Sequence, residues 1–284
     1  MVERLKLAIS RARERRNAGG GEAAAVAERP AAAPAPAPSD AERLWDRLEE
    51  HHIDPNVLAR ERIVTHGKTD PSYTAFDMLR TRLIKTAISQ GKRHIGMVSP
   101  TKGCGKTVVS ANLALSFARN PQTTVILADF DMRSPRLSRI LGLPDRRSIR
   151  WLLDGSAAPD DYLLRGGERL ALALNSEVIH DSAELLQRRE TAQAIAEMDR
   201  MFAPDLVLYD LPPLLIGDEA MSFLPRLDAV LMIVAAGHTR ADQIEECEVM
   251  LGDESKLLGI LLNKAAPDTI SNYYYSYGYG YGMD

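Results

Sequence analysis

A glycine-bearing turn at residues 99–107, with the sequence SPTKGCGKT, constrains the fold of this chain more than any other stretch. An apolar run typical of a buried strand precedes it at 94–98, and a segment with helical spacing of apolar residues follows at 108–118. Glycine lets consecutive backbone N–H groups turn inward around a phosphate, and a helix N-terminus adds partial positive charge. Strand, turn and helix in this order predict a phosphate-binding loop.

The last three residues of the turn carry the chemistry of such a loop. Lys106 is expected to reach the β- and γ-phosphates of a nucleoside triphosphate, and the Thr107 hydroxyl to take a place on Mg²⁺. The general pattern has a glycine five residues before Gly105, where this chain has Pro100. An ordinary glycine-rich turn is the alternative, but the flanking strand and helix favour a nucleotide site.

Composition limits the classes of protein to which this chain can belong. Its 284 residues, 45% hydrophobic and 26% charged, suit one globular α/β domain with extra segments. No run of about 18 apolar residues predicts a membrane span, and residues 1–16 lack the apolar core of a secretory signal. The net charge of −4 gives no reason to expect nucleic acid as a partner. Only two cysteines, Cys104 and Cys247, favour a reducing cytoplasm over a disulfide framework.

Changes in composition divide the chain into five parts. Residues 1–17 predict a basic amphipathic helix, which either docks on a membrane or partner or is a solvated tail helix. Residues 18–38 are rich in Ala, Pro and Gly and predict a flexible linker. A helical lead-in is expected over 39–70, the phosphate-loop domain over 71–266 and a separate tail over 267–284.

Two apolar strands are predicted to end in carboxylates. The strand at 123–128 is followed by Asp129 and Asp131, whose spacing places them on one side of an extended segment. The strand at 205–210 ends at Asp210, before a Leu-Pro-Pro sequence, and predicts a Walker B element that holds Mg²⁺ directly or through water. Ligands bind at this edge of open α/β sheets, although a simple polar loop remains the alternative for the Asp129 segment.

Further apolar patterns complete an alternation of strands and helices. Strands are predicted at 170–174, 228–234 and 257–263, and helices at 71–89, 182–198 and 241–251. Strands that alternate with helices predict an α/β fold with a doubly wound, mostly parallel sheet and flanking helices.

Six of the nine tyrosines lie together at 273–281, where several alternate with glycine. Such a segment buries little apolar surface and is not expected to pack as a core. It predicts exposed phenols on a flexible tail, with stacking or self-association as the alternative role. The tyrosines are Tyr273, Tyr274, Tyr275, Tyr277, Tyr279 and Tyr281.

Together these motifs resemble the bacterial tyrosine kinases of the capsule and exopolysaccharide class, the CpsD/CapB family of the MinD/ParA-like superfamily. The resemblance covers about residues 76–284. It rests on the loop ending at 103–107, the Asp-x-Asp-x-Arg-x-Pro element at 129–135, Asp210 with its two prolines, and the tyrosine cluster. MinD- and ParA-like partition ATPases share the first three features, so the tyrosine cluster makes the resemblance specific.

The resemblance implies ATP and Mg²⁺ as cofactors and gives roles to the site residues. Asp129 is expected to take the proton of the attacking phenol and Lys106 to stabilise the transferred phosphoryl group. Asp131 and Asp210 are expected to hold Mg²⁺ together with Thr107. The ATP-binding residues implied are Thr101, Lys102, Gly103, Cys104, Gly105, Lys106, Thr107, Val108 and, at the adenine, Asn263. The six clustered tyrosines are the implied phosphoacceptors.

The implied function is that of an ATP-dependent protein-tyrosine autokinase that regulates polymerisation or export of exopolysaccharide or capsule. Its tail would be phosphorylated by a neighbouring molecule, which requires a homo-oligomer. The implied partner is the cytoplasmic segment of a membrane-embedded, Wzz-like chain-length regulator, which would place this cytoplasmic protein at the inner membrane. A MinD/ParA-like positioning ATPase and a non-catalytic, nucleotide-sensing partner of the regulator are the alternatives.

The chain departs from the family pattern at the loop and at the helix before it. Lys102 and Cys104 replace a proline and a small or acidic residue, and Thr101 stands where partition ATPases have their signature lysine. The helix that mediates ring assembly in the family reads Glu-x-x-Arg-x-x-Arg, of which only Arg80 is retained. Arg133 is expected to stabilise its loop or to contact the phosphate of a neighbouring molecule.

Overall fold

The computed structural model describes residues 40–64, 72–143, 147–252 and 256–265. The predicted N-terminal helix, the linker and the tyrosine cluster lie outside these residues. Within the described ranges, no helix is both long enough and apolar enough to pass through a bilayer.

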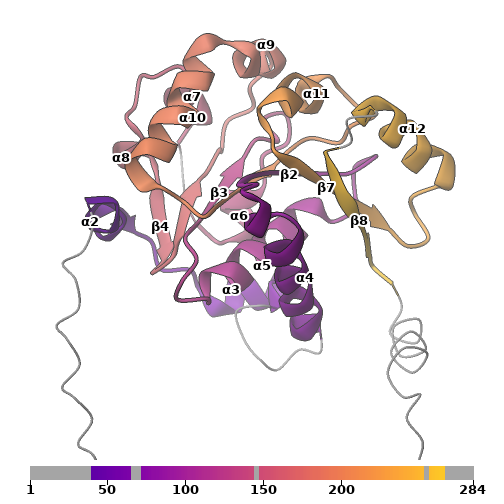
Figure 1. The fold of residues 1–284 in the computed structure, drawn as a ribbon, viewed down its shortest axis with the longest axis horizontal. Coiled ribbons are helices and arrows are strands. Elements are labelled where there is room, and N and C mark those ends of the chain that lie inside the picture. Colours follow the sequence, from indigo (N-terminus) through magenta and orange to yellow (C-terminus); the bar gives the residue numbers. More distant parts are fainter. Residues whose placement is uncertain (1–39, 65–71, 144–146, 253–255, 266–284) are drawn as a thin grey trace, which may run out of the picture. The chain divides into compact units, whose positions relative to one another are not determined.

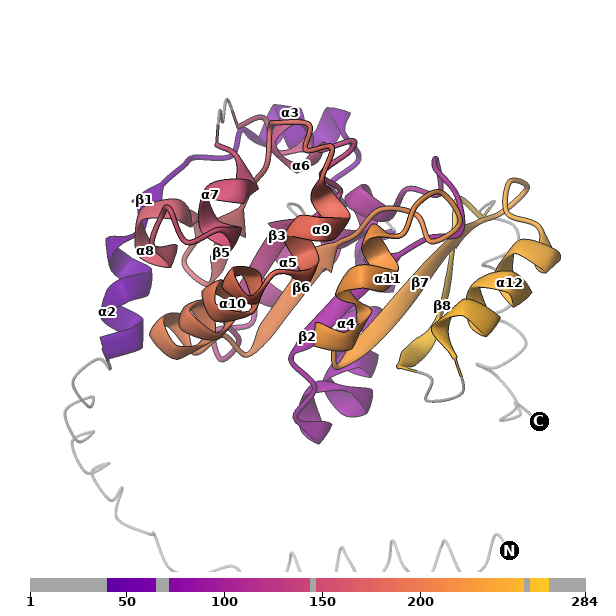
Figure 2. The same cartoon turned by 90° about the horizontal axis from the view of Figure 1, so that it is seen from above.

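The described part of the chain is organised around one sheet. Its strands are β1 (Glu49–Glu50), β2 (His94–Val98), β3 (Val125–Asp129), β4 (Leu164–Gly167), β5 (Leu170–Ala173), β6 (Leu206–Asp210), β7 (Ala229–Ala235) and β8 (Leu257–Asn263). They are arranged in the order β1-β4-β5-β3-β6-β2-β7-β8, as Figures 1 and 2 show. All neighbours are parallel except β4 and β5, which are antiparallel. The predicted mostly parallel sheet is confirmed.

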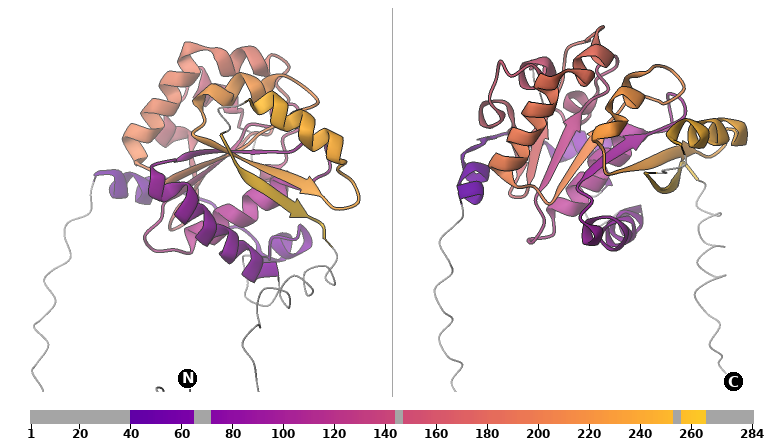
Figure 3. Two further views of the ribbon diagram at one scale, coloured as in Figure 1. Left: turned by 45° about the vertical axis from the view of Figure 1, so that its right-hand side comes forward. Right: turned by 45° about the horizontal axis from the view of Figure 1, so that its top comes forward.

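Helices cover both faces of this sheet. They are α2 (Asp40–Arg47), α3 (Pro55–Arg60), α4 (Ser72–Thr86), α5 (Lys106–Ala118), α6 (Leu137–Ile140), α7 (Ile149–Leu153), α8 (Pro159–Tyr162), α9 (Ser182–Gln187), α10 (Arg189–Phe202), α11 (Glu219–Phe223) and α12 (Ala241–Leu251). Helices α3 to α6 lie on one face, and α7 to α12 lie on the other (Figures 1 and 3). The fold is therefore doubly wound, as expected.

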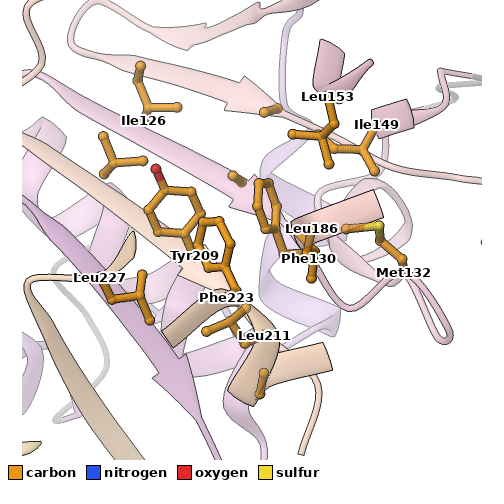
Figure 4. Packing of buried hydrophobic residues seen from close by; sticks show 14 of the residues in the cluster. Ile126, Phe130, Met132, Ile149, Leu153, Leu186, Tyr209, Leu211, Phe223 and Leu227 are labelled. Carbon is orange, nitrogen blue, oxygen red and sulfur yellow. The ribbon is translucent and has the colours of Figure 1, made fainter. Parts of the chain in front are cut away.

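Each face of the sheet has its own apolar core because the central strands are buried on both sides. In β6, Val207 and Tyr209 point into one cluster, and Leu206 and Leu208 point into the other, as the two-residue period of a strand requires. The ring of Tyr209 lies 4.9 Å from those of Phe130 and Phe223, centroid to centroid, and Figure 4 shows these rings at the centre of the first cluster.

The fold differs from the expectations at the predicted helix 182–198 and in the lead-in. The helix predicted over 182–198 is interrupted at Arg188, whose backbone is extended (φ −61°, ψ 153°), and the second part continues to Phe202. The lead-in is more than helical, because the short strand β1 joins the sheet beside β4. Its helix α2 buries Trp45, whose Nε1 donates to the Phe202 carbonyl at 2.9 Å.

Candidate nucleotide site

Three adjacent parallel strands bring the predicted loop and carboxylates together. Asp129 of β3 is paired in register with Asp210 of β6, and Asp210 with Met97 of β2, just before the loop. Both carboxylates are fully buried. The carboxyl edge that the sequence predicted as the ligand site is therefore assembled from residues far apart in the chain.

Lys106 lies at the centre of this edge. Gly105 adopts a left-handed conformation (φ 87°) and lets α5 begin at Lys106. Lys106 Nζ donates to Asp210 Oδ1 at 2.8 Å and lies 3.5 Å from Asp131 Oδ2. Burial opposes the charge on this lysine, but the neighbouring Asp210 and Asp131 outweigh it and raise the pKa of Lys106. Ser110, which the sequence analysis missed, lies one turn later with its hydroxyl 3.1 Å from Asp210 Oδ1.

Asp129 holds the turn that follows β3. Its Oδ2 accepts hydrogen bonds from the backbone N–H groups of Arg136 at 3.1 Å and Leu137 at 3.0 Å, and its Oδ1 accepts one from Asp131 at 3.3 Å. Burial, reinforced by the nearby Asp210, raises the pKa of Asp129 well above its ordinary value. A carboxylate in this environment binds a proton more readily than an exposed one, which suits a proton acceptor.

The residues predicted to hold Mg²⁺ fit that ion with help from other ligands. Asp210 Oδ2 is buried and has no hydrogen-bond partner among the described residues, as a site for metal-bound water requires. Thr107 lies in the first turn of α5, and the pKa of Asp131 is raised, chiefly by burial. No group of three or more His, Cys, Asp or Glu in the described ranges could hold a metal, so phosphate and water oxygens would complete its coordination.

Two side chains at the end of β8, one from its last residue and one from the residue that follows, brace the phosphate loop. Asn263, the predicted adenine contact, donates from Nδ2 to the Cys104 carbonyl at 2.9 Å. Lys264 donates from Nζ to the Gly103 carbonyl at 2.7 Å. In this structure Asn263 therefore contacts the loop itself. The sequence did not predict a role for Lys264, and only its position directly after Asn263 could have indicated that it lies near the site.

The two unusual loop residues occupy different environments. Cys104 is buried, with its sulfur 3.3 Å from the Thr101 carbonyl oxygen and 3.5 Å from Thr239 Oγ1. This packing agrees with a small filler residue. Lys102 is exposed, and its carbonyl oxygen lies 3.0 Å from Nε2 of His238, a further contact that the sequence did not predict.

A cavity of about 690 Å³ opens beside the loop. Its lining includes loop residues 102–109, among them the predicted Thr107 and Val108, together with Asp131 and Asn263. The lead-in supplies part of the wall, from Ala59 to Val64, and so does α6. Arg133 points elsewhere, because it forms an ion pair with the buried Glu219 of α11. The six clustered tyrosines lie outside the described residues.

A phosphate loop, a lysine and two carboxylate-bearing strands in this geometry define a nucleotide-binding protein of the phosphate-loop class. A family model described as the CobQ/CobB/MinD/ParA nucleotide binding domain matches residues 95–277. The tyrosine-protein kinase CpsD of Streptococcus pneumoniae serotype 4 (strain TIGR4) is 32% identical over 176 residues, which are 60% of this chain and 75% of CpsD. The chain belongs to the CobQ/CobB/MinD/ParA family and, within it, to the bacterial tyrosine kinases that CpsD represents.

Other relatives agree with this placement, and a solved structure shares the fold. EpsB of Ralstonia nicotianae is 29% identical over 73% of this chain, but the match covers only 27% of EpsB. The match to AmsA of Erwinia amylovora covers 32% of that protein, so the chain spans less than a third of these two relatives. The kinase domain of Escherichia coli tyrosine kinase ETK has the same fold, with a TM-score of 0.63, 20% identity and coverage of 80% of this chain and 84% of that domain.

Proposed function

We propose that this chain is an ATP-dependent protein-tyrosine autokinase that phosphorylates the tyrosines at 273–281 in trans. The observation that carries the proposal is the contact of Lys106 with Asp210 and Asp131 at the mouth of a phosphate loop, in a chain that carries its own tyrosine cluster. The names of CpsD and of YwqD of Bacillus subtilis, both tyrosine-protein kinases, support it.

The site residues suit transfer of a phosphoryl group to a phenol. ATP supplies the group, and Mg²⁺ neutralises its charge. The phenol oxygen bonds to the γ-phosphorus as the bond to the bridging oxygen of ADP breaks. Because a phenol has a pKa near 10, its proton must leave for a nearby base, and Asp129 with its raised pKa is the proposed acceptor. In this proposal the Lys106 ammonium group leaves Asp210 and binds the oxygens of the transferred phosphoryl group, where it stabilises their negative charge.

The proposed setting is the synthesis or export of exopolysaccharide or capsule at the cytoplasmic side of the inner membrane. One relative, ExoP of Rhizobium meliloti, is named a succinoglycan biosynthesis transport protein. The proposed partners are further copies of this chain and the cytoplasmic segment of a Wzz-like regulator. Phosphates, each adding about −1.5 to −2 charges, would make the tails of neighbouring copies repel one another.

The first test incubates the full chain with ATP and Mg²⁺ and maps phosphotyrosine by mass spectrometry. We expect phosphate within 273–281. Lys106→Met should reduce it at least 100-fold, because the transferred charge then lacks its cation. Lys85→Met, on the exposed face of α4, is the matched control and should leave it unchanged. Phe at all six clustered tyrosines should remove most of the signal.

Mixing two variants tests transfer between molecules. An active chain with six Phe residues in the tail should phosphorylate the intact tail of the Lys106→Met chain. Unmodified tails in every mixture would contradict the kinase proposal. ATP hydrolysis without tail phosphate would favour a MinD/ParA-like ATPase, and ATP binding without turnover a nucleotide-sensing partner.

A further inference from the structure

Three arginines line the nucleotide cavity beyond the phosphate loop. Arg62 follows α3, while Arg136 and Arg139 lie on the segment that leads from Asp131 through α6. All three are exposed. In the described part of the chain, none of their guanidinium groups has an ion-pair partner.

The backbone at these positions is tied to the catalytic machinery. The Arg136 N–H donates to Asp129 Oδ2 at 3.1 Å, so the proposed base fixes the start of α6. The Arg62 carbonyl accepts from Asn112 Nδ2 of α5 at 3.1 Å, so the helix that begins at the phosphate loop fixes the lead-in. Arg62 and Arg136 are thus held beside the same cavity as the loop by backbone contacts that do not use their side chains.

The turn after α6 lies against α3. Gly142, just after α6, lies so close to Val57 of α3 that a Cβ at Gly142 would stand 2.8 Å from Val57 Cγ1. Arg139 and Arg62 therefore lie on neighbouring segments, and both line the cavity. They form one cationic wall of the cavity, which we call the arginine wall together with Arg136.

The carboxylates that line the cavity do not neutralise the charge of the arginine wall. Its two acidic lining residues are Glu61 and Asp131. Asp131 lies 3.5 Å from Lys106 Nζ, and Glu61 lies 3.6 Å from Arg60 Nε, so each already has a cation beside it. Guanidinium groups bind phosphate through two parallel hydrogen bonds. An added phosphate group would therefore meet unneutralised arginines in a cavity that Lys106 and Asp131 also line.

We propose that the arginine wall binds phosphotyrosine in the 273–281 segment of a second copy of the chain. This rests on the proposed function, because only an autokinase would meet that ligand routinely. Tyrosines two positions apart, such as Tyr277 and Tyr279, lie about 7 Å apart in an extended segment. A phosphate on one would then hold the next in the same cavity, beside Lys106 and Asp131, so that a partly phosphorylated tail is a better acceptor than an unmodified one.

Binding of synthetic peptides tests the proposal without any enzymatic step. The peptide covers residues 270–284, either unmodified or carrying phosphate on Tyr277 and Tyr279. Fluorescence anisotropy measures its affinity for the full chain with Phe at all six clustered tyrosines, which removes competition from its own tail. We expect the phosphopeptide to bind at least ten-fold tighter. The triple variant Arg62→Gln, Arg136→Gln, Arg139→Gln should lose that advantage.

The matched control removes three exposed arginines that lie outside the cavity lining. Arg47→Gln, Arg82→Gln, Arg189→Gln changes the net charge equally and should keep the ten-fold preference. Equal binding of both peptides, or equal loss in the control, would overturn the proposal. An equally large loss of ATP affinity in the triple cavity variant would also overturn it, because the arginines would then bind the nucleotide. Displacement of the phosphopeptide by phosphatidylglycerol vesicles would overturn it as well, because the arginines would then bind a lipid headgroup.

The two proposals fail in distinguishable ways. If no tail phosphate forms with ATP, the autokinase fails while the binding of a chemically made phosphopeptide is still measured. If tail phosphate forms but the phosphopeptide binds no better than the unmodified one, only the arginine wall fails.

Discussion

At the scale of single residues, Asp129 combines a proposed chemical role with an evident structural one. Both of its oxygens accept backbone hydrogen bonds from the turn that carries Asp131 and Arg136. The sequence predicted that Asp129 and Asp131 follow a buried strand and lie on one side of it, because their spacing and the apolar run before them are visible in the sequence. The hydrogen bonds from the backbone of the following turn to Asp129 depend on the path of the chain, which the spacing of the two acids does not predict.

Asp129→Asn should stabilise the protein at neutral pH and impair transfer. The pKa of Asp129 is raised in the folded state, so its ionised form opposes folding above that pKa. Replacing it with a neutral amide should raise the free energy of unfolding, measured by urea denaturation. The gain should shrink as pH falls toward the pKa of the unfolded chain, below which Asp129 is protonated in both states. Phosphotransfer should drop about 10²–10⁴-fold.

Asp160→Asn, at an exposed position of α8, is the control for both readouts. Transfer within a few-fold of the unmodified protein would remove Asp129 as the base. A loss of stability at neutral pH would mean that the hydrogen bonds to the turn outweigh the cost of the buried charge.

The parts of the site that the sequence missed come from distant segments. The phosphate loop and the carboxylates follow from local patterns in the sequence and lie together at one edge of the sheet. The side-chain contacts that brace the loop do not follow from local patterns, because Asn263 and Cys104 are 159 positions apart and His238 and Lys102 are 136 apart. A single sequence contains no signal for contacts at that separation, since register and loop paths decide them.

At the scale of elements, α4 and α5 are joined by a cluster of charges. Arg80 Nη1 donates to the Ser116 carbonyl at 2.7 Å, and Asp77 Oδ1 lies 3.0 Å from Arg80 and 2.6 Å from Arg119. Arg80 is the arginine retained from the motif of the family's ring-forming helix, and Asp77 stands where that motif has its other arginine. In this structure the remaining motif residue serves the packing of the two helices.

Asp77→Ala should therefore weaken the contact between α4 and α5. It removes one carboxylate that two guanidinium groups share, and hydrogen bonds to charged groups contribute about 1.5–3 kcal/mol each at partly buried sites. We expect the free energy of unfolding to fall by about 1–2 kcal/mol in urea titrations. Asp160→Ala should change it by less than about 0.5 kcal/mol. An unchanged stability in Asp77→Ala would show that solvent replaces the cluster.

Long elements were predictable and most short ones were not. The strands β2, β3, β6, β7 and β8 and the helix α12 lie close to their predicted bounds, because each corresponds to an apolar run or a helical pattern of at least five residues. Strand β1 and helices α6 to α8 span two to five residues, too few for a period. The break at Arg188 was invisible for the opposite reason, since the helical pattern continues on both sides of it.

At the scale of the described molecule, the lead-in is part of the folded core. Trp45 is 4% exposed and meets the ring of Phe202 edge-on, with 5.8 Å between the ring centroids. Leu58 and Ile63, from α3 and the turn after it, are buried in the cluster on the other face. The lead-in thus contributes to both apolar cores and reaches across the edge of the sheet.

The two tryptophans of the chain offer a matched test of this arrangement. Trp45→Ala should lower the free energy of unfolding by about 3–5 kcal/mol, because it leaves a cavity and an unpaired Phe202 carbonyl. Trp151→Ala should cost less than about 1 kcal/mol, since Trp151 is 46% exposed. Thermal or urea denaturation of both variants gives the comparison. Similar losses would mean that the lead-in contributes little to stability.

The stretch from Ala59 to Val64 lines the cavity, yet the family model begins at residue 95. A protein truncated to residues 95–277 would keep the whole phosphate loop but would lose the part of the cavity wall between Ala59 and Val64. Substitutions in the earlier stretch can change what enters beside the nucleotide while the handling of phosphate stays the same. Under the proposed function, the choice of acceptor can therefore change through residues that precede the matched region, without any change in the phosphate loop.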